Sequence, residues 1–416
     1  MKRNLIVIFL YLRLFDPLIQ SIFWPLIEKV LREDGNYKFH VISYEYSGAQ
    51  LSAEQADKIN EWRRLGVEWT PLTYHPGKNL LLKAIDLVTG FWKLFRLRRQ
   101  GYRHLITYGS IAGAFGYLNG LLLGMNLFLY SFEPHSEYLR DCGLLSNDSL
   151  KFKILHNLEL KAARFAKVIA SGTVFMADYL AKQVRSSAIF FKIPSVTDSD
   201  KFSFNADHRA AVRSELGLAD DARLLYYSGK FGGLYYESEF ARMYRCLLDM
   251  EPNLHLLIVS PDSNEYIFDL FDRENVPRSR YFIRHSTFDE IHRFASAADF
   301  GIVAVPPGAS KRFVSNIKVG EYLCSGLPFL ITRGVSEDYL YAEQKRVGVV
   351  VNDFSDAEIR NAWPTIRDYL AEDKYMLRAH CRSIGIQYRG LNNLWPIFQS
   401  ALYALIGGNE IRQRSA

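Results

Sequence analysis

Two successive runs of alternating strand-like and helix-like segments constrain the fold of this chain most strongly. Short apolar segments such as NLIVIFLYL at 4–12 and KFHVISYE at 38–45 alternate with longer amphipathic segments at 17–33 and 52–66. A polar stretch with a proline at 191–204 interrupts this order, which then starts again with RLLYYSGK and LHLLIVSP. Such alternation is typical of parallel, doubly wound sheets. We therefore expect an α/β protein with two Rossmann-like domains that face each other across an interdomain cleft.

The interruption and the tail suggest how the chain is divided. We expect residues 1–190 and 191–380 to form the two Rossmann-like domains. Residues 381–416 are expected to form C-terminal helices that pack back toward the first domain, because 391–406 has the spacing of an amphipathic helix. Ligands of open α/β sheets bind outside the carboxyl ends of the strands, which here means the interdomain cleft.

Positive charge is concentrated in the first half of the chain. The formal net charge is +6, yet residues 1–190 contain 24 Lys and Arg against 16 Asp and Glu. This excess suits an anionic partner such as a membrane surface or a phosphorylated lipid. No recognised nucleic-acid-binding motif is visible, so we do not expect nucleic acid as a partner.

The segment 88–104 is both aromatic and basic and has two interpretations. It is either a helix at a membrane interface or a solvated helix with an ordinary apolar core face. In the first interpretation, apolar side chains enter the interface and basic ones meet anionic head groups. The apolar set is Phe91, Trp92, Leu94 and Phe95, and the basic set is Lys93, Arg96, Arg98 and Arg99.

The cysteines and the N-terminal segment bear on localisation. The four cysteines are widely separated and form no CxxC pair, so neither a zinc site nor a disulfide framework is indicated. Arg13, Asp16 and Pro17 interrupt the apolar residues 5–24, which favours a strand and a helix over a signal peptide or membrane span. We expect a cytoplasmic protein, peripheral at the inner face of the membrane if 88–104 binds lipid.

Two short motifs are weak indicators of chemistry. Asp198 and Asp200 form a D-x-D that could hold Mg²⁺ or Mn²⁺, but they lie in the interdomain linker, so we interpret them as a cap and expect no metal site. The glycines at 109–116 have GxxxGxxG spacing rather than GxGxxG, which indicates close helix packing and disfavours a dehydrogenase. No cofactor is expected.

Two glycine-containing loops are more informative. In YYSGKFGG at 226–233, a buried strand ends at Gly229 and Lys230, where backbone N–H groups and a lysine can meet a phosphate. In SNIKVGEYLCSGLPF at 315–329, a helix follows a loop, with Ser315 or Asn316 as its cap.

Lys318 and Glu321 lie three residues apart on one face of this second helix. They are either a surface ion pair or part of a nucleotide site. The helix start offers N–H groups and a positive dipole to a diphosphate, and Glu321 can accept hydrogen bonds from ribose hydroxyls.

With these segments in place, the chain resembles GT-B glycosyltransferases of the large family four type. The matching segments are IPSVTDSDKFSF, VRSELGL, LLYYSGK, ASAADFGIVAVPP, KVGEYLCSGLPFLI and VGVVVND, in the family's order within residues 190–353. The resemblance implies a nucleoside-diphosphate sugar donor held by the second domain and an acceptor held by the first, without an obligatory metal. It implies that Glu321 binds ribose, that Lys230 binds phosphate, and that YFIRHS at 281–286, with Arg284, holds the base.

The chain departs from the family pattern at two positions. Phe313 stands where the family has the first glutamate of its Glu-x7-Glu motif, and Tyr235 stands where it has a second basic residue. Lys318 can take over the phosphate role. The family is retaining, but the missing glutamate leaves the donor-sugar contacts and the stereochemical outcome open.

Candidate acceptor residues follow strands of the first domain. Glu133 and His135, in YSFEPHSEYL at 130–139, can deprotonate or position an acceptor, although a histidine before a helix is as often a cap or core donor. Arg13 and Asp16 follow the first strand and can contact the acceptor or a phosphate, or simply stabilise their loop.

The resemblance implies a retaining, metal-independent hexosyltransferase. It would move a sugar from a nucleoside diphosphate to a glycan or lipid-linked acceptor, in cell-surface polysaccharide or glycoconjugate synthesis. The alternatives are a non-catalytic nucleotide-sugar-binding protein, favoured by the missing glutamate, and a GT-B-fold sugar-nucleotide epimerase, whose own signature is not visible.

Overall fold

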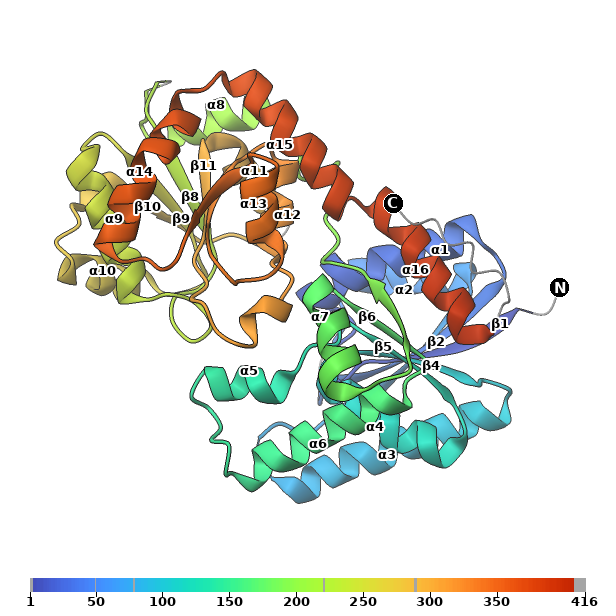
Figure 1. Ribbon diagram of the computed structural model, residues 1–416. Helices are drawn as coiled ribbons and strands as arrows, with labels where there is room; N and C mark the ends of the chain where they lie inside the picture. The colour runs from blue at the N-terminus through green and yellow to red at the C-terminus, as the bar shows by residue number, and fades with distance from the viewer. Residues whose placement is uncertain (1–2, 49, 78, 220, 288–289, 408–416) are drawn as a thin grey trace. The chain divides into compact units, whose positions relative to one another are not determined.

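The computed structural model describes residues 3–48, 50–77, 79–219, 221–287 and 290–407. The chain divides into two compact units (Figure 1). Unit 1 comprises Met1–Pro194 together with Leu394–Ala416, and unit 2 comprises Ser195–Asn393. The C-terminal segment therefore belongs to the same unit as the N-terminus, and unit 2 is inserted between them in the sequence.

Unit 1 contains a seven-stranded parallel sheet with the strand order β3-β2-β1-β4-β5-β6-β7. The strands are β1 (Asn4–Phe9), β2 (Tyr37–Tyr46), β3 (Val67–Tyr74), β4 (His104–Tyr108), β5 (Asn126–Tyr130), β6 (Val168–Ser171) and β7 (Ile189–Lys192). β1 is central, and its last four residues are buried, as expected of a strand covered on both faces.

The helices of unit 1 connect these strands and cover both faces of the sheet. They are η1 (Ile19–Phe23), α1 (Trp24–Glu33), α2 (Ala53–Leu65), α3 (Leu80–Arg99), α4 (Gly109–Leu123), α5 (His135–Asp141), α6 (Leu150–Phe165), α7 (Val174–Tyr179), η2 (Leu180–Val184) and α16 (Leu391–Ile406). Figure 1 shows α1 and α2 on one face, and α3, α4 and α6 on the other.

The glycines of α4 bring this helix close to the sheet. A Cβ atom on Gly116 would lie 2.5 Å from Thr107 Cγ2, and one on Gly113 would lie 3.0 Å from Leu129 Cδ2. The predicted close packing of GSIAGAFG is therefore confirmed: the segment forms the first two turns of a helix that lies directly on β4 and β5.

The last helix of the chain, α16, completes the core of unit 1. Phe398 is fully buried and packs against Phe23, Phe128 and Tyr130, with ring centres 5.6–6.1 Å apart. Tyr403 donates a hydrogen bond of 3.1 Å to Asp34. The preceding helix, α15 (Lys374–Arg389), packs instead on α12 (Ile317–Cys324) of unit 2, where Gly385 allows close contact with Cys324.

Unit 2 contains a six-stranded parallel sheet with the strand order β10-β9-β8-β11-β12-β13. The strands are β8 (Leu224–Ser228), β9 (His255–Val259), β10 (Tyr281–Arg284), β11 (Phe300–Val303), β12 (Phe329–Thr332) and β13 (Gly348–Val351). Besides α12 and α15, the helices are α8 (Ala206–Glu215), α9 (Ser238–Met250), α10 (Asn264–Arg273), η3 (Arg278–Arg280), α11 (Ile291–Ala297), η4 (Lys311–Phe313), α13 (Asp338–Gln344) and α14 (Asp356–Ala371).

In each sheet, the first three strands of the sequence are added toward one edge and the later strands toward the other edge, so the order of addition reverses once. In unit 1 it reverses between β1 and β4, and in unit 2 between β8 and β11. Loops that leave the carboxyl ends of strands at such a reversal separate from each other and leave room for a ligand. The predicted α/β architecture with two Rossmann-like domains is confirmed, and each domain has its own ligand-binding edge.

The two chain segments that enter and leave unit 2 pair with each other. Thr197 forms a parallel bridge with Gly390, and its N–H donates to the Arg389 carbonyl oxygen at 2.8 Å. Asp198 Oδ1 accepts hydrogen bonds of 3.0 Å from the backbone N–H groups of Asp200 and Lys201. The first carboxylate of the D-x-D therefore caps a turn in the entering segment.

The helix predicted over 88–104 is α3, and it begins earlier and ends at Arg99. Leu94 is fully buried, so it belongs to the core and not to an exposed membrane-binding face. Trp92, in contrast, is 55% exposed. None of the helices in the described ranges combines the length and apolar character needed to cross a bilayer.

Candidate functional site

The strongest candidate site lies at the strand reversal of unit 2, where β8 and β11 end. Gly229 follows β8 directly, and the loop after β11 leads through Asn316 into α12. Asn316 is the N-cap residue but makes no side-chain cap hydrogen bond. Its buried side-chain nitrogen has no hydrogen-bond partner within the described part of the chain. The first turn of α12 thus offers unpaired donors at the ligand-binding edge.

Gly229 and Lys318 are in direct contact at this edge. The backbone of Gly229 has a φ of +151°, and a Cβ atom there would lie 2.7 Å from Lys318 Cε and 2.9 Å from Lys318 Nζ. Any side chain at position 229 would displace the lysine. The glycine after β8 and the lysine of α12, which are 89 positions apart in the sequence, therefore form one surface.

The ring of Tyr235 also contacts the Lys318 ammonium group. Lys318 Nζ lies 4.2 Å from the centre of the Tyr235 ring, within the range of a cation–π interaction. The position where the family resemblance expects a second basic residue is thus occupied by an aromatic ring. That ring holds a basic side chain supplied by another element.

Glu321 lies one turn further along α12 and is only 4% exposed. Burial raises the pKa of Glu321 to about 7, against the opposing effect of the positive charges of Lys318 and Lys201. No hydrogen bond to the Glu321 carboxylate is found among the described residues. A buried carboxylate without a donor is costly unless a ligand supplies one.

The remaining residues predicted for the donor site are spread along the same edge. Lys230 is exposed, and its carbonyl oxygen accepts a hydrogen bond from Tyr227. Arg284 ends β10, and its Nη1 donates to the neighbouring Ile283 carbonyl oxygen at 2.9 Å. The Arg284 carbonyl oxygen accepts from Ser260 N at 3.1 Å, which joins the loops after β9 and β10.

Ser315 has a supporting position. Its Oγ accepts hydrogen bonds from Ser195 N at 2.9 Å and from Arg389 Nη1 at 2.6 Å. Arg389 is 2% exposed and also pairs with buried Asp338. Ser315 therefore ties the loop before α12 to the rest of unit 2, and we regard it as a positioning residue for Asn316 and Lys318.

The candidate acceptor residues lie at the strand reversal of unit 1. Tyr108 ends β4, and burial, Glu133 and Asp16 together raise its pKa, although a hydrogen bond with Ser131 opposes this. Both carboxylates therefore lie close enough to the Tyr108 phenol to affect its pKa. Asp16 follows β1 and Glu133 follows β5, so both residues lie near the end of β4. Asp16 Oδ1 also accepts from Leu18 N at 3.0 Å, so it stabilises its own loop as well.

His135 and Arg13 make contacts of different kinds. His135 begins α5 and stacks on Tyr138 with ring centres 5.6 Å apart. Burial lowers the pKa of His135, so the imidazole is neutral at pH 7 and able to accept a proton. Arg13 is exposed and lies over the Tyr46 ring, 5.3 Å from its centre.

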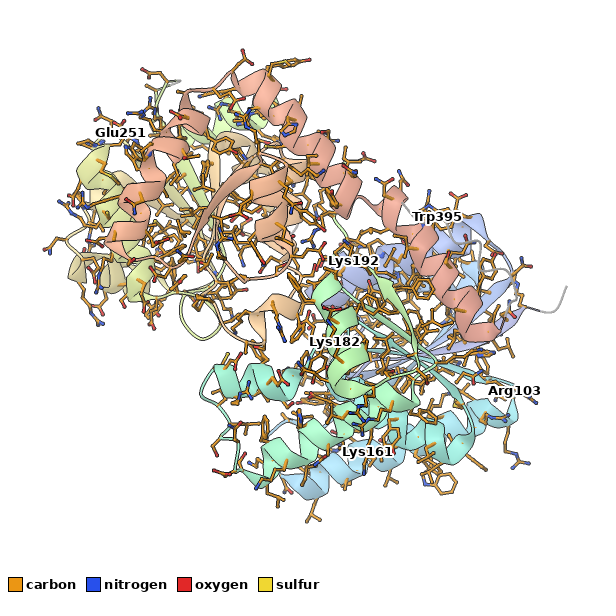
Figure 2. The ribbon with its side chains drawn as sticks, in the orientation of Figure 1. Arg103, Lys161, Lys182, Lys192, Glu251 and Trp395 are labelled. Atoms are coloured by element: carbon orange, nitrogen blue, oxygen red, sulfur yellow. The ribbon has the colours of Figure 1, made fainter. Side chains whose placement is uncertain are left out.

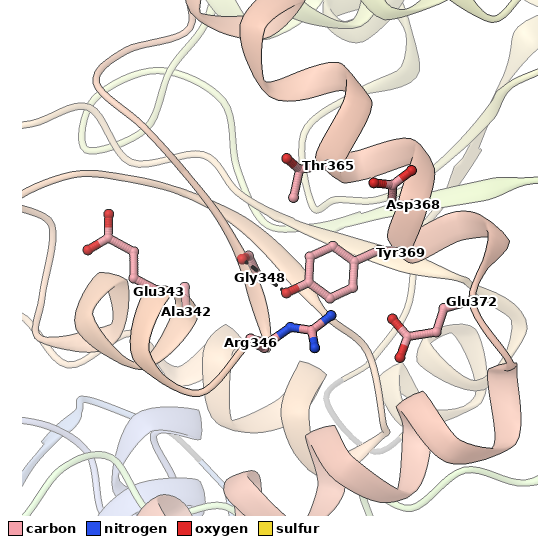
Figure 3. Close-up of a pocket in the computed structure, with 8 residues that line it drawn as sticks. All are labelled: Ala342, Glu343, Arg346, Gly348, Thr365, Asp368, Tyr369 and Glu372. Atoms are coloured by element: carbon pink, nitrogen blue, oxygen red, sulfur yellow. Dashed lines mark hydrogen bonds between the residues drawn. The ribbon is translucent and has the colours of Figure 1, made fainter.

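One hollow elsewhere on unit 2 is poorly suited to a nucleotide. A hollow of about 260 Å³ lies at the amino end of β13, the opposite edge of the sheet, and Figure 3 shows Tyr369 donating to the Gly348 carbonyl oxygen within it. Its ionisable lining groups are three carboxylates and one guanidinium, Glu343, Asp368, Glu372 and Arg346. This net negative charge would repel a diphosphate.

No cluster of three or more His, Cys, Asp or Glu side chains that could hold a metal ion occurs among the described residues.

Comparison with known proteins gives the fold. No protein-family model matches the sequence, and no curated protein matches it. Sucrose-phosphate synthase from Thermosynechococcus elongatus matches 98% of this chain with 100% of its own, at a TM-score of 0.72 and 15% identity. HepE of Anabaena, solved in complex with UDP, matches 97% of this chain with 100% of its own, at a TM-score of 0.65 and 13% identity.

A third similar structure is WaaG, a glycosyltransferase involved in lipopolysaccharide biosynthesis. It matches 97% of this chain with 100% of its own, at a TM-score of 0.65 and 15% identity. The chain has the GT-B glycosyltransferase fold. The sequence-based expectation of this fold is confirmed.

Within the GT-B fold, the position of the missing glutamate has a physical explanation. Phe313 is fully buried in η4, and the Arg312 guanidinium lies 4.6 Å from the centre of its ring. The side chain at this position is thus buried and is covered by a guanidinium group. A carboxylate buried in its place would be strongly disfavoured without a partner.

Sequence reasoning missed three side chains that the GT-B fold brings to the two edges. They are Tyr108 at the end of β4 in unit 1, and Tyr235 and Lys201 near Lys318 and Glu321 in unit 2. Tyr235 was noted only as a departure from the family pattern. Tyr108 is the last residue of β4 and Tyr235 lies in the loop after β8, so a search for aromatic residues at strand ends and in the loops that follow them would have found both. Lys201 lies in a linker without any such signal.

Proposed function

We propose that this protein is a glycosyltransferase that uses a nucleoside-diphosphate sugar as donor. The observation that carries this proposal is the arrangement of Gly229, Lys318 and Glu321 at the strand reversal of unit 2. It combines a glycine backbone that a phosphate can approach, a positioned ammonium group and a buried carboxylate that lacks a hydrogen-bond donor. HepE of Anabaena, which shares the fold, was solved with UDP and with UDP-glucose, which supports a donor of this class.

The donor residues have distinct roles in this proposal. The Glu321 carboxylate accepts hydrogen bonds from the ribose hydroxyls. Lys318, Lys230 and the N-terminus of α12 stabilise the diphosphate, and the segment of Arg284 holds the base. When the bond between the sugar C1 and the diphosphate oxygen breaks, its electron pair stays on that oxygen. The positive groups therefore stabilise charge that develops in the transition state.

The acceptor residues lie in unit 1. An acceptor hydroxyl forms the new bond to the sugar C1 and loses its proton. His135, neutral because of its burial, and Glu133 are the proposed groups that position this hydroxyl or take its proton, with Arg13 and Asp16 as further acceptor contacts. By its resemblance to family four, the proposed reaction retains the anomeric configuration and needs no metal.

The experiment that tests the proposal is calorimetry of UDP, GDP and ADP binding, followed by incubation with the corresponding sugar nucleotides. We expect one nucleoside diphosphate to bind and Glu321→Ala to weaken this binding by about 10- to 100-fold, because a charge-assisted hydrogen bond contributes about 1.5–3 kcal/mol. Lack of binding by all three nucleotides, or equal binding by folded Glu321→Ala, would contradict the proposed site.

The products formed without an acceptor separate the alternatives. A glycosyltransferase slowly releases free sugar and nucleoside diphosphate, a non-catalytic binding protein releases neither, and an epimerase changes the sugar without releasing the diphosphate. EDTA is added in a parallel reaction, and full loss of activity that Mn²⁺ restores would contradict metal independence.

We further propose that the acceptor is lipid-linked and that α3 contacts the membrane. Four apolar side chains, Leu81, Ile85, Val88 and Trp92, are between 46% and 77% exposed. Their spacing of four, three and four residues places them on one face of the helix. Arg96 and Arg99, both exposed, continue the same face toward its C-terminal end.

This face of α3 carries the chemistry of a peripheral membrane helix. Apolar side chains can enter the interface while the guanidinium groups meet anionic head groups. Lys161 on α6 and Arg103 before β4, both labelled in Figure 2, are exposed and add to the positive charge of unit 1. The proposal places the protein at the inner face of the cytoplasmic membrane, in the synthesis of a cell-surface polysaccharide or glycoconjugate.

A further inference from the structure

A buried carboxylate organises a second cluster in unit 1, at the carboxyl ends of β1, β2 and β3. Asp86 of α3 is fully buried. Its Oδ2 accepts a hydrogen bond of 2.7 Å from Tyr11, and its Oδ1 accepts one of 2.5 Å from His75 Nδ1. The Lys83 ammonium lies 3.8 Å from Oδ2 and donates to the His75 carbonyl oxygen at 2.5 Å. The carboxylate thus holds three functional side chains at the ligand-binding edge of the sheet.

Aromatic rings form a contiguous cluster beside this carboxylate, which we call the platform although neighbouring rings are tilted against each other. Tyr11, Tyr74 and Tyr46 pack edge to face in sequence, with ring centres 5.7 Å apart at each step. Phe115 of α4 stacks on Tyr11 at 4.8 Å. Tyr46, at the end of β2, is 50% exposed, so the platform opens to solvent at this end.

Cationic side chains lie over two rings of the platform, and an imidazole lies nearby. Lys83 Nζ lies 4.2 Å from the centre of the Tyr74 ring, and the Arg13 guanidinium lies 5.3 Å from the centre of the Tyr46 ring. Because His75 Nδ1 donates to Asp86, the other ring nitrogen, Nε2, is available. No hydrogen bond to Nε2 is found among the described residues, and the His75 side chain is 30% exposed.

We propose that Tyr46, Tyr74, His75 and Lys83 form a subsite for a sugar ring of the acceptor. The C–H groups on one face of a pyranose are apolar and slightly positive, so they pack against the negative faces of aromatic rings. Hydroxyl groups at the edge of the ring can bond with His75 Nε2 and Lys83, whose positions Asp86 fixes. Sites that bind small molecules are typically lined by apolar and aromatic side chains, together with a few oriented polar groups.

The position of this subsite beside α3 suits the head group of a lipid-linked acceptor. Lys83 and Asp86 lie on the inner face of the first turns of α3, while Leu81 and Ile85 lie on the exposed face. The sugar of an acceptor anchored in a membrane would therefore reach the subsite beside the helix that contacts the lipid. This inference rests on the proposed function, of which it specifies the acceptor.

The test is saturation-transfer NMR of the full chain with the methyl glycosides of glucose, galactose, mannose and N-acetylglucosamine. We expect saturation transfer to the ring protons of at least one glycoside. Tyr46→Ala should lower this transfer by about fivefold, whereas Tyr46→Phe, which keeps the ring, should preserve it. Tyr375→Ala serves as the matched control, because Tyr375 is an exposed tyrosine of unit 2.

The outcomes separate this inference from the donor proposal. Unaltered binding by Tyr46→Ala of the nucleoside diphosphate that wild type binds, measured by calorimetry, shows that the variant is folded and that unit 2 is intact. Equal transfer in wild type and Tyr46→Ala, or no transfer to any glycoside, would overturn the subsite while leaving the donor site standing. Lys83→Met provides a second variant that keeps the apolar stem, and it should weaken transfer to the same glycoside.

Discussion

The Lys318 ammonium group lies 4.2 Å from the centre of the Tyr235 ring. The ring holds the ammonium group near the end of β8. Removal of the ring should therefore weaken phosphate binding without changing the net charge of the protein. Tyr235→Leu should weaken binding of the nucleoside diphosphate by about 2- to 30-fold, since a cation–π contact contributes about 0.5–2 kcal/mol. Tyr235→Phe should bind like wild type in the same calorimetric titration. Equal weakening in both variants would mean that the phenol hydroxyl, and not the ring, is needed.

A second prediction concerns the contact between Gly229 and Lys318. Gly229→Ala should reduce diphosphate affinity by about tenfold, because the new Cβ would displace the lysine side chain. Gly233→Ala is the matched control, since Gly233 also has a positive φ, of +63°, but no atom lies within 4 Å of its would-be Cβ. If both variants lose affinity equally, backbone strain rather than the contact with Lys318 would be responsible.

A third prediction follows from the titration of Glu321. Burial raises the pKa of this carboxyl from 4.5 to about 7 in the folded protein, while the unfolded chain titrates near the ordinary value. The folded state therefore binds more protons between about pH 4.5 and 7. The stabilisation from the neutral carboxyl is complete below pH 4.5 and is lost as pH rises through 7, a change of about 3 kcal/mol.

Two measurements check this titration. In urea unfolding, the free energy of unfolding should fall from pH 5 to pH 8, and Glu321→Gln should remove this part of the slope. Nucleotide binding should show the opposite trend, because only the ionised carboxylate accepts from both ribose hydroxyls. Affinity should rise from pH 6 to pH 8 in wild type and stay flat in Glu321→Gln. A pH-independent wild type would exclude the carboxylate from the ribose site.

A fourth prediction concerns the exposed face of α3. Wild type should sediment with vesicles that contain anionic lipid at low salt and should dissociate as salt rises, because screening shortens the Debye length to about 10 Å at 0.1 M. Arg96 and Arg99 changed together to Glu should stay in solution, since each basic residue contributes about 1 kcal/mol at such a surface. The control changes Arg360 and Arg367 of α14, which are similarly exposed, to Glu. Equal loss in both double variants would indicate a general charge effect.

The strand and helix order could be predicted from the sequence because it depends on local periodicity. The predicted helix at 391–406 agrees with α16 to the residue. The ends of elements were less accurate. The strand predicted over 4–12 ends at Phe9, because Leu10 and the residues after it, although apolar, turn away into the loop that carries Arg13.

The site was predictable only where its residues are neighbours in the sequence. Lys318 and Glu321 lie on one turn of a helix, so their spacing indicated that they act together. Other residues of the two clusters follow different strands, and only the order of strands in the sheet brings them together. Examples are Tyr108 with Asp16, and His75 with Tyr11. The role of Ser315 depends on Arg389, which is 74 residues away, and no local pattern indicates this contact.

The pairing of Thr197 with Gly390 has a consequence for how this chain could be recombined. Neighbouring strands lie about 5 Å apart, so unit 2 begins and ends at almost the same point in space. Such a segment can be replaced as a whole. Residues 195–393 could be exchanged for those of another GT-B protein without altering the register of the seven strands of unit 1. Under the proposed function, donor choice and acceptor choice are encoded in separable modules, which can change independently during evolution or in the laboratory.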